Sequence, residues 1–317
     1  MTEPGSLPVV AVVGATATGK TALGVALALR LGGEVVNADA MQLYRGMDIG
    51  TAKATPAERR GIPHHLIDVL EVTQEASVAA YQRDAREAIG RIRAAGRVPV
   101  VVGGSGLYVR AALDVLDIPP TDPSVRARLE QEYAEVGLEP LRARLRALDP
   151  AAEGAIVAGN ARRVIRALEV VELTGEPFSA RMPERAYVAD TVAIGLRLER
   201  PRLDVRIDAR AEAMFAAGLV AEVEALLPRG LRRGRTAARA LGYAQALGVL
   251  DGVLSCSDAV ARTAQLTRRF ARRQESWFRA DPRVTWYDAQ SVTLVEDAVE
   301  LVRRGGRQGP GSGTMAP

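Results

Sequence analysis

Residues 9–21 read Val-Val-Ala-Val-Val-Gly-Ala-Thr-Ala-Thr-Gly-Lys-Thr, and this stretch decides the fold of the chain. Its run of apolar, mostly β-branched residues is typical of a strand buried on both faces in a parallel sheet. The run stops at Gly14, and a helix with leucines along one face begins near Lys20. Between them lies the pattern G-x-x-x-x-G-K-T, which predicts a phosphate-binding loop when it joins a strand to a helix.

Such a loop binds phosphate through its backbone. Its N–H groups close around phosphate oxygens, and the N-terminus of the following helix adds a partial positive charge. Lys20 supplies a point charge, and the hydroxyl of Thr21 is suited to be a ligand of Mg²⁺. The motif predicts a polyphosphate or pyrophosphate ligand and does not by itself identify ATP. A chance glycine loop is the alternative, which the strand–loop–helix context disfavours.

The composition limits the class of protein. The 317 residues are 48% hydrophobic and 25% charged, which suits one large or two modest globular domains. The single cysteine, Cys256, excludes an internal disulfide framework and fits a reducing compartment. No apolar run is long enough to span a membrane, and the first residues lack the pattern of a signal peptide. We therefore expect a cytoplasmic, soluble protein with no membrane partner. A monomer is our expectation for the oligomeric state, which the sequence leaves open.

Strand-like and helical segments alternate along the first third of the chain. Further strands are predicted at 34–39, 64–69 and 98–103, and a helix is predicted at 78–95. This alternation predicts a parallel, doubly wound sheet that binds its ligands at the carboxyl ends of the strands.

The pattern changes near residue 117. Turn-forming residues are followed only by helices, predicted at 124–136, 139–147 and 161–173. Strand-like sequence returns later. The remaining expected elements are a strand at 191–198, long amphipathic helices at 202–227 and 257–278, and a last strand at 284–287.

The simplest organisation is an α/β protein with one inserted domain. Residues 1–116 and 189–304 form the P-loop core, a doubly wound parallel sheet. Residues 117–188 form an inserted all-helical domain, and residues 305–317 form a disordered tail.

Asp39 is the first candidate for chemistry, because it follows the second predicted strand. In a parallel sheet this places its carboxylate across the ligand crevice from the bound phosphates. There it could accept a proton from a nucleophile or orient Mg²⁺ through water. Capping of a helix or loop is the alternative role.

A second glycine-rich segment, Gly103-Gly104-Ser105-Gly106-Leu107-Tyr108, follows another apolar strand. It predicts a second backbone concavity at the same crevice, where Ser105 could bond a transferred oxygen or a phosphate. A plain glycine turn is the alternative. Many nucleoside-triphosphate hydrolases carry a metal-binding Asp at such a strand end. Gly-Gly at this point therefore argues against an ATPase motor.

Basic residues form two clusters in predicted helices. Arg162, Arg163 and Arg166 lie three and four residues apart, and several arginines accompany aromatic residues between 262 and 279. Such helices suit binding to a phosphate backbone, and a solvated helix face is the alternative. Arg239 lies in a helix-breaking segment, from which it can reach a phosphate in bidentate geometry.

The two histidines, His64 and His65, are adjacent in a predicted strand. Adjacent strand residues point to opposite faces, so the pair cannot ligate one metal ion. We expect no zinc site. Lys20 and Lys53 stand out for another reason, because they are the only lysines among the 42 basic residues.

With these residues the chain closely resembles the bacterial tRNA dimethylallyltransferases, also called tRNA isopentenyltransferases. The resemblance extends from about Val10 to Trp286. It rests on motifs that occur in order along the chain. They are the phosphate loop Gly14–Thr21, Asp39–Lys53, Pro63–Asp68, Gly103–Tyr108, Arg163–Val170 and Arg268–Arg279.

The resemblance implies a reaction. A dimethylallyl group would pass from dimethylallyl diphosphate to N6 of an adenine next to the anticodon of tRNA, giving N6-isopentenyladenosine and pyrophosphate. Asp39 would accept the proton from N6, and Ser105 and Arg239 would stabilise the leaving pyrophosphate. The adenine would have to leave its stack to reach the site.

The resemblance also implies the binding residues. Mg²⁺ would bind at Thr21. The diphosphate would be held by Gly14, Ala15, Thr16, Ala17, Thr18, Gly19, Lys20 and Thr21. The tRNA anticodon stem-loop would be contacted by Asp39, Ala40, Met41, Gln42, Ser105, Arg126, Arg162, Arg163, Val164, Ile165 and Arg166.

The chain departs from the family pattern at three positions. Ser105 stands where threonine is common, a change that keeps the hydroxyl. Ala54 stands where proline is usual, and Ala161 stands where an acid often follows Asn160. The last departure leaves the tRNA contacts of that helix open.

Two other functions are compatible with parts of the pattern. A small-molecule kinase can also place an acid after the second strand and arginines in a helical lid. Its lid is usually far shorter than the insertion at 117–188, and it has little use for the late arginine-rich helix. A non-catalytic RNA-binding module leaves unexplained why a complete phosphate loop and Asp39 occur together.

Overall fold

The computed structural model describes residues 7–181 and 185–305, which form two compact units. The core unit contains the described residues up to Asp114 and from Tyr187 onward, and the helical unit is Val115–Ala186. These boundaries lie two residues before the expected ones at both ends of the insertion. Residues 306–317 of the expected tail lie outside the described residues. Gly305, its first residue, instead ends a helix.

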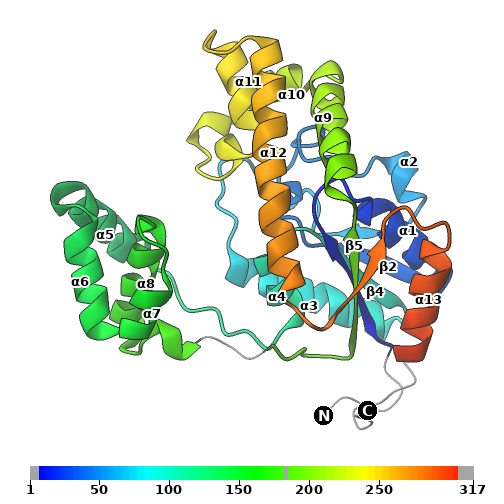
Figure 1. Cartoon of the computed structure of the whole chain (residues 1–317), viewed down its shortest axis with the longest axis horizontal. Coiled ribbons are helices and arrows are strands. Elements are labelled where there is room, and N and C mark those ends of the chain that lie inside the picture. Colours follow the sequence, from blue (N-terminus) through cyan, green and yellow to red (C-terminus); the bar gives the residue numbers. More distant parts are fainter. Residues whose placement is uncertain (1–6, 182–184, 306–317) are drawn as a thin grey trace. The chain divides into compact units, whose positions relative to one another are not determined.

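A six-stranded parallel sheet forms the centre of the core unit, as predicted (Figure 1). Its strand order is β3-β2-β4-β1-β5-β6. The central strand β1 (Val9–Gly14) pairs with both β4 and β5 and is buried throughout. The other strands are β2 (Gly33–Asn37), β3 (His64–His65), β4 (Val98–Gly103), β5 (Thr191–Arg197) and β6 (Val284–Asp288).

Helices cover both faces of this sheet. On one face, α1 (Lys20–Leu31) and α13 (Leu294–Gly305) pack their leucines, valines and alanines against β1, β2, β4 and β5. Another pair, α3 (Val78–Ala94) and α4 (Gly106–Leu113), packs together and against β2 and β4. A doubly wound sheet results, and its strands all end at the edge where the phosphate loop begins.

Four further helices of the core unit pack around a second apolar cluster. They are α9 (Arg200–Ala216), α10 (Leu219–Leu226), α11 (Tyr243–Leu250) and α12 (Cys256–Arg279). The prediction of one helix over 202–227 is wrong. The helix is interrupted at Gly218, whose φ of 97° is a left-handed conformation that glycine adopts readily.

The helical unit consists of short helices around the buried residues Leu129, Leu141, Leu145 and Leu168. Its helices are α5 (Pro123–Val136), α6 (Leu138–Leu148), α7 (Pro150–Ala155) and α8 (Ala161–Thr174), followed by the 3-10 turn η2 (Phe178–Arg181). Helix α7 was not predicted, because six residues are too few to show helical periodicity. Asp149 caps it by accepting a hydrogen bond from the Ala152 N–H.

Two predicted strands are shorter than expected. The strand predicted at 64–69 is reduced to β3, because Leu66 and Asp68 take left-handed φ values of 60° and 58° that a strand cannot contain. The strand predicted at 34–39 ends at Asn37. Asp39 instead caps the 3-10 turn η1 (Ala40–Leu43). No helix among the described residues has the length and apolar character needed to cross a membrane.

Candidate active site

The phosphate loop follows β1 in the conformation that its glycines permit. Gly14 and Gly19 have φ values of 141° and 94°, and Ala17 is also left-handed at 64°. The hydroxyl of Thr18 and the ammonium of Lys20 both donate to the carbonyl of Ala15, at 2.8 and 2.6 Å. These bonds hold the loop closed upon itself, with α1 starting at Lys20 as predicted.

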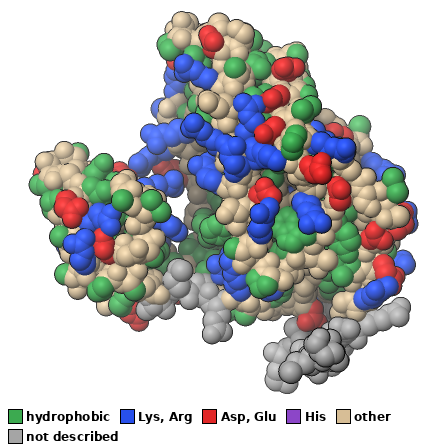
Figure 2. Space-filling view, viewed as in Figure 1, with side chains coloured by type: hydrophobic (Ala, Val, Ile, Leu, Met, Phe, Trp, Pro, Cys, Tyr) green, Lys and Arg blue, Asp and Glu red, His purple; other side chains and the backbone are tan. Residues whose placement is uncertain are grey.

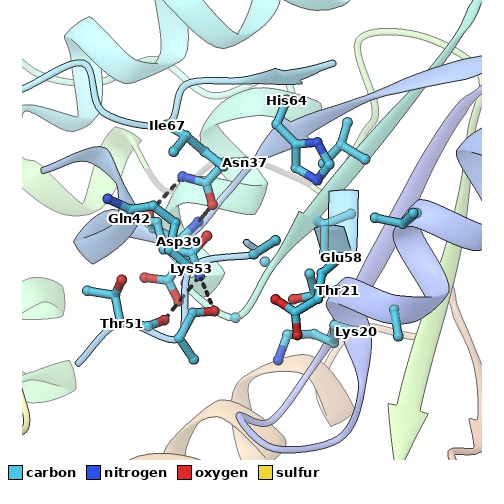
Figure 3. A pocket seen from close by; sticks show the side chains of 18 of the residues that line it. Lys20, Thr21, Asn37, Asp39, Gln42, Thr51, Lys53, Glu58, His64 and Ile67 are labelled. Atoms are coloured by element: carbon cyan, nitrogen blue, oxygen red, sulfur yellow. Dashed lines mark hydrogen bonds between the residues drawn. The ribbon is translucent and has the colours of Figure 1, made fainter. Parts of the chain in front are cut away.

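A cavity of about 450 Å³ opens beside this loop. Figure 3 shows Lys20 and Thr21 on one side of it and Asn37, Asp39 and Gln42 on the other. Other polar side chains in its wall include those of Thr51, Lys53, Glu58, His64 and Arg210. The strand-end acid and the phosphate loop therefore share one cavity, as the parallel sheet predicts.

Asp39 is held in place by its neighbours. The buried side chain of Asn37 accepts from the Asp39 N–H at 3.0 Å and donates to the carbonyls of Asp39 and Leu66. The Asp39 carboxylate accepts from the Met41 N–H at 3.0 Å, which caps η1. The capping role and the chemical role are thus compatible, because one carboxylate oxygen caps and the side chain still lines the cavity.

The cavity shifts the pKa values of its two facing charges. The pKa of Lys20 is lowered to about 8, mainly by burial; the Asp39 carboxylate opposes this shift and the Arg210 guanidinium adds to it. Burial also raises the pKa of Asp39, against the opposing effects of the Met41 hydrogen bond and Lys20. A carboxylate with a raised pKa is a stronger proton acceptor than an exposed one, which suits a general base.

The second glycine segment borders the same cavity as the phosphate loop. Gly103 and Gly104 line the cavity, but neither has a left-handed φ. A Cβ at Gly103 would lie 2.2 Å from the Ala38 carbonyl oxygen, and one at Gly104 would lie 2.3 Å from Nε2 of Gln274. These glycines provide room for neighbouring atoms.

Ser105 supports Asp39 and is not among the residues that line the cavity. Its hydroxyl accepts a hydrogen bond of 3.2 Å from the Ala40 N–H, the residue after Asp39. The predicted residues Ser105, Asp39, Ala40, Met41 and Gln42 are therefore brought together. Gln42 faces the cavity and donates to the Thr51 carbonyl at 3.1 Å.

Arg239 ends the 3-10 turn η4 (Ala237–Arg239), where its side chain is exposed. It is not among the residues that line the cavity. The structure thus brings Asp39 and Lys20 together but leaves Arg239 outside the cavity wall.

Arg210 was not anticipated from the sequence. It lies on α9, lines the cavity and approaches the Thr16 hydroxyl at 3.4 Å. Burial lowers the pKa of Arg210, and Arg206 adds to the effect. Among the chain's many arginines nothing in its local sequence marks it, since only the packing of α9 brings it to the phosphate loop.

Lys53 has a structural position in the cavity wall. Its side chain is 3% exposed, and its ammonium lies 2.6 Å from a carboxylate oxygen of each of Asp48 and Asp68. It also donates to the Tyr44 carbonyl at 2.9 Å. These contacts join the loop after η1 to the loop after β3.

The two histidines have different surroundings. Nε2 of His65 lies 2.6 Å from a carboxylate oxygen of Glu34. His64 lines the cavity, and burial lowers its pKa. No group of three or more His, Cys, Asp or Glu side chains suited to one metal ion occurs among the described residues.

The helical unit divides the predicted RNA-contacting residues into three groups. Arg162 and Arg163 are exposed near the N-terminus of α8. Arg126 and Arg166 both pair with the buried carboxylate of Glu169. The side chains of Val164 and Ile165 are buried in the core of the unit, so they do not form part of an RNA-binding surface.

Several arginines of α12 lie on its outer face, whereas Arg268 pairs with Asp208 of α9. Arg269, Arg272 and Arg273 are exposed, while Ala271 and Gln274 face inward. Figure 2 shows Lys and Arg side chains gathered where Figure 1 places α12. This face presents positive charge of the kind that a phosphate backbone requires.

The fold and the cavity together define a P-loop α/β protein that sets a phosphate loop opposite a strand-end carboxylate. A family model described as IPP transferase matches residues 42–281. The chain is also 60% identical to the tRNA dimethylallyltransferase of Kineococcus radiotolerans over 94% of its own length and 95% of the relative's. The chain therefore belongs to the IPP transferase family.

Solved structures have the same architecture. The tRNA isopentenylpyrophosphate transferase of Bacillus halodurans is 39% identical with a TM-score of 0.70, over 95% of this chain and 97% of that one. A eukaryotic dimethylallyltransferase described as acting on tRNA is 25% identical with a TM-score of 0.77. That match covers 93% of this chain and 77% of the other.

Proposed function

We propose that this protein transfers a dimethylallyl group from dimethylallyl diphosphate to N6 of an adenine next to the anticodon of tRNA. The products are N6-isopentenyladenosine and pyrophosphate. The observation that carries the proposal is the shared cavity, in which a carboxylate of raised pKa faces a phosphate loop. Membership of the IPP transferase family and the names of the relatives support the same reaction.

The proposed reaction is a displacement at the allylic carbon. The adenine N6 forms a bond to C1 of the dimethylallyl group as the bond from C1 to the diphosphate oxygen breaks. Asp39 accepts the proton that N6 loses. The electron pair of the broken bond leaves with pyrophosphate, so negative charge develops on the phosphate side of the cavity.

The phosphate loop stabilises that leaving group. Backbone N–H groups of residues 17–21, the N-terminus of α1 and the Lys20 ammonium all present positive potential to it. Arg210 adds a second cation at the same end of the cavity. Ser105 contributes by holding the segment that carries Asp39. The contact of Arg239 with the leaving pyrophosphate stays a proposal that rests on the family resemblance, since its side chain is exposed and does not line the cavity.

The cavity fits Mg²⁺ bound largely through the substrate. Mg²⁺ retains several waters and binds proteins through few oxygen ligands plus phosphates. The Thr21 hydroxyl is exposed at the cavity, and the carboxylates of Asp39 and Glu58 line it. We propose that Thr21 holds the ion. When bound, it would neutralise part of the charge on the diphosphate.

Positive side chains provide the proposed tRNA contacts. Arg162 and Arg163 on α8 and the exposed arginines of α12 suit the phosphate backbone of the anticodon stem-loop. Arg126 and Arg166 are paired with Glu169, so we propose that they orient the helical unit's surface as well as contact RNA. Action in the cytoplasm as a monomer remains a prediction.

Purified protein, Mg²⁺, dimethylallyl diphosphate and an unmodified tRNA provide the test. We expect N6-isopentenyladenosine in the digested tRNA and one pyrophosphate released per group transferred, detected by mass spectrometry and a coupled assay. ATP in place of the prenyl donor is the control. Consumption of ATP in this control, together with no prenyl transfer when dimethylallyl diphosphate is supplied, would instead support the kinase alternative.

A further inference from the structure

Gln274 is a buried polar side chain that the proposed reaction does not use. It lies on the inner face of α12 and is 5% exposed. Its Oε1 accepts from the Thr16 N–H of the phosphate loop at 2.8 Å. Its Nε2 donates to the Gly104 carbonyl at 2.9 Å, in the loop that follows β4.

These two bonds join the ends of neighbouring strands. Thr16 follows β1 and Gly104 follows β4, and the two strands are paired in the sheet. One bond requires an acceptor and the other a donor, a combination that a neutral primary amide supplies. A carboxylate of the same shape supplies acceptors only. The contact is therefore specific to glutamine chemistry as well as to its length.

Two side chains of α12 explain why residues 104 and 106 are glycines. A Cβ at Gly104 would come within 2.3 Å of Nε2, so residue 104 has no room for a side chain. One helical turn later, Trp277 occupies the corresponding space at Gly106, where a Cβ would lie 2.1 Å from Nε1. Helix α12 therefore lies directly against this loop at Gly104 and Gly106.

Thr16 is held from two sides. Gln274 on α12 binds its N–H, and Arg210 on α9 approaches its hydroxyl. The Thr16 N–H is thereby occupied by protein, which leaves the N–H groups further along the loop for phosphate. The spacing between the phosphate loop and the Ser105 loop depends on these contacts.

We propose that Gln274 is a positioning residue for the diphosphate subsite. It fixes the phosphate loop relative to the loop of Ser105, and through Ser105 relative to Asp39. This inference rests on the proposed function for its link to prenyl transfer. Its effect on pyrophosphate binding does not depend on that reaction.

Helix α12 has two different faces. Its outer face carries the arginines proposed to bind RNA, and its inner face contacts the phosphate loop. Arg272 and Arg273 are exposed while Gln274, the next residue, is buried. Substitution of Gln274 should therefore affect the diphosphate side of the reaction without removing charge from the outer face. A role limited to seating α12 would affect both sides.

The test compares Gln274→Glu and Gln274→Leu with the unmodified protein. Binding of inorganic pyrophosphate with Mg²⁺ is measured by calorimetry, and KM for dimethylallyl diphosphate and for tRNA by steady-state assay. We expect pyrophosphate affinity to fall about tenfold in both variants, since each leaves a buried group unpaired. The KM for dimethylallyl diphosphate should rise as this affinity falls, and the KM for tRNA should stay unchanged.

The pH dependence separates positioning from packing. Protonation of the glutamate in Gln274→Glu restores a donor to the Gly104 carbonyl, so its affinity should recover as the pH falls. Gln274→Leu has no group to protonate and should show no recovery relative to the unmodified protein. Gln265→Glu, the same change at an exposed position of α12, is the matched control and should bind pyrophosphate normally.

Two outcomes would overturn the inference. One is unchanged pyrophosphate affinity in both Gln274 variants. The other is an equal rise in both KM values with a lower thermal midpoint and no recovery of Gln274→Glu at low pH. Failure of the proposed function is distinct, because the unmodified protein would then bind pyrophosphate but transfer no prenyl group.

Discussion

Two glycine-rich loops follow neighbouring strands of this sheet, and they use glycine for different reasons. In the phosphate loop, Gly14 and Gly19 adopt left-handed backbone conformations. A Cβ at Gly14 would also lie 2.6 Å from the Leu196 carbonyl oxygen, but a Cβ at Gly19 would meet no atom within 4 Å, so Gly19 is the glycine needed for its conformation alone. In the loop after β4, Gly103 and Gly104 have ordinary φ values, but added Cβ atoms would lie 2.2 and 2.3 Å from other atoms.

The difference shows that a glycine pattern has two physical meanings. Gly19 permits a backbone shape that surrounds a ligand, whereas Gly103 and Gly104 admit the chain segments that organise the site. Only the first meaning has a spacing that can be recognised in sequence. The second depends on which atoms the fold brings close.

The largest effect should come from Asp39, which lies opposite the first loop and is supported by the second. Asp39→Asn keeps an acceptor for the Met41 N–H but cannot accept the proton from N6. We expect kcat to fall by about a thousandfold, within the range for loss of a general base. Steady-state prenyl transfer measures kcat, and tRNA affinity by filter binding is the control.

The same variant should be at least as stable as the unmodified protein. Because the folded-state pKa of Asp39 is raised, the stability that Asp39 contributes falls as the pH rises from the ordinary value toward the raised one. Asparagine does not titrate, so the stability of Asp39→Asn has no such dependence on pH. The thermal midpoint of the variant should therefore exceed that of the unmodified protein by the largest amount above the raised pKa. Retained activity in Asp39→Asn would remove Asp39 from the chemistry.

A paired glycine substitution tests the comparison directly. Gly103→Ala places a Cβ against the backbone of Ala38 and should destabilise the fold by about 3 kcal/mol. Gly19→Ala meets no such obstacle and should destabilise by about 1 kcal/mol through its left-handed φ. Thermal unfolding measures both. Pyrophosphate affinity should be lost in Gly19→Ala although that variant still folds, and equal stability of the two variants would contradict the distinction.

The charge of the phosphate loop should make ligand binding depend on pH. The pKa of Lys20 is lowered to about 8, so the ammonium loses its proton as the pH rises through that value. Pyrophosphate affinity should then fall by up to about tenfold per pH unit. Lys20→Arg keeps its charge over the same range, so its affinity should fall less steeply. If pyrophosphate affinity fell equally steeply with pH in the two proteins, a group other than Lys20 would be responsible.

The smallest effect should come from the supporting loop. Ser105→Ala removes the acceptor for the Ala40 N–H, a hydrogen bond worth about 1 kcal/mol, so kcat should fall about fivefold. Ser105→Thr retains the hydroxyl and should keep most of the activity. A loss of a hundredfold or more in Ser105→Ala would instead indicate that the hydroxyl contacts the leaving group directly.

The core of the fold was accessible from local patterns. The apolar runs that become β1 and β4 and the periodicity of α1 and α3 are properties of contiguous residues, so their parallel arrangement could be predicted. The extent of β3 could not be predicted. The strand ends early because Leu66 and Asp68 take left-handed backbone conformations, and Asp68 forms an ion pair with Lys53, a residue that lies outside the strand. The break at Gly218 was also missed, since a single glycine is compatible with a continuous helix.

The sequence by itself determined that a phosphate loop begins at Gly14 and that Asp39 follows the next strand along the chain. Both facts depend on spacing along the chain and on the geometry of parallel sheets. Only the tertiary structure decided that Arg210 and Gln274 meet at Thr16, that Ser105 supports Ala40, and that Val164 and Ile165 are buried. Those contacts join residues far apart in the chain, and their local sequence carries no record of the partner.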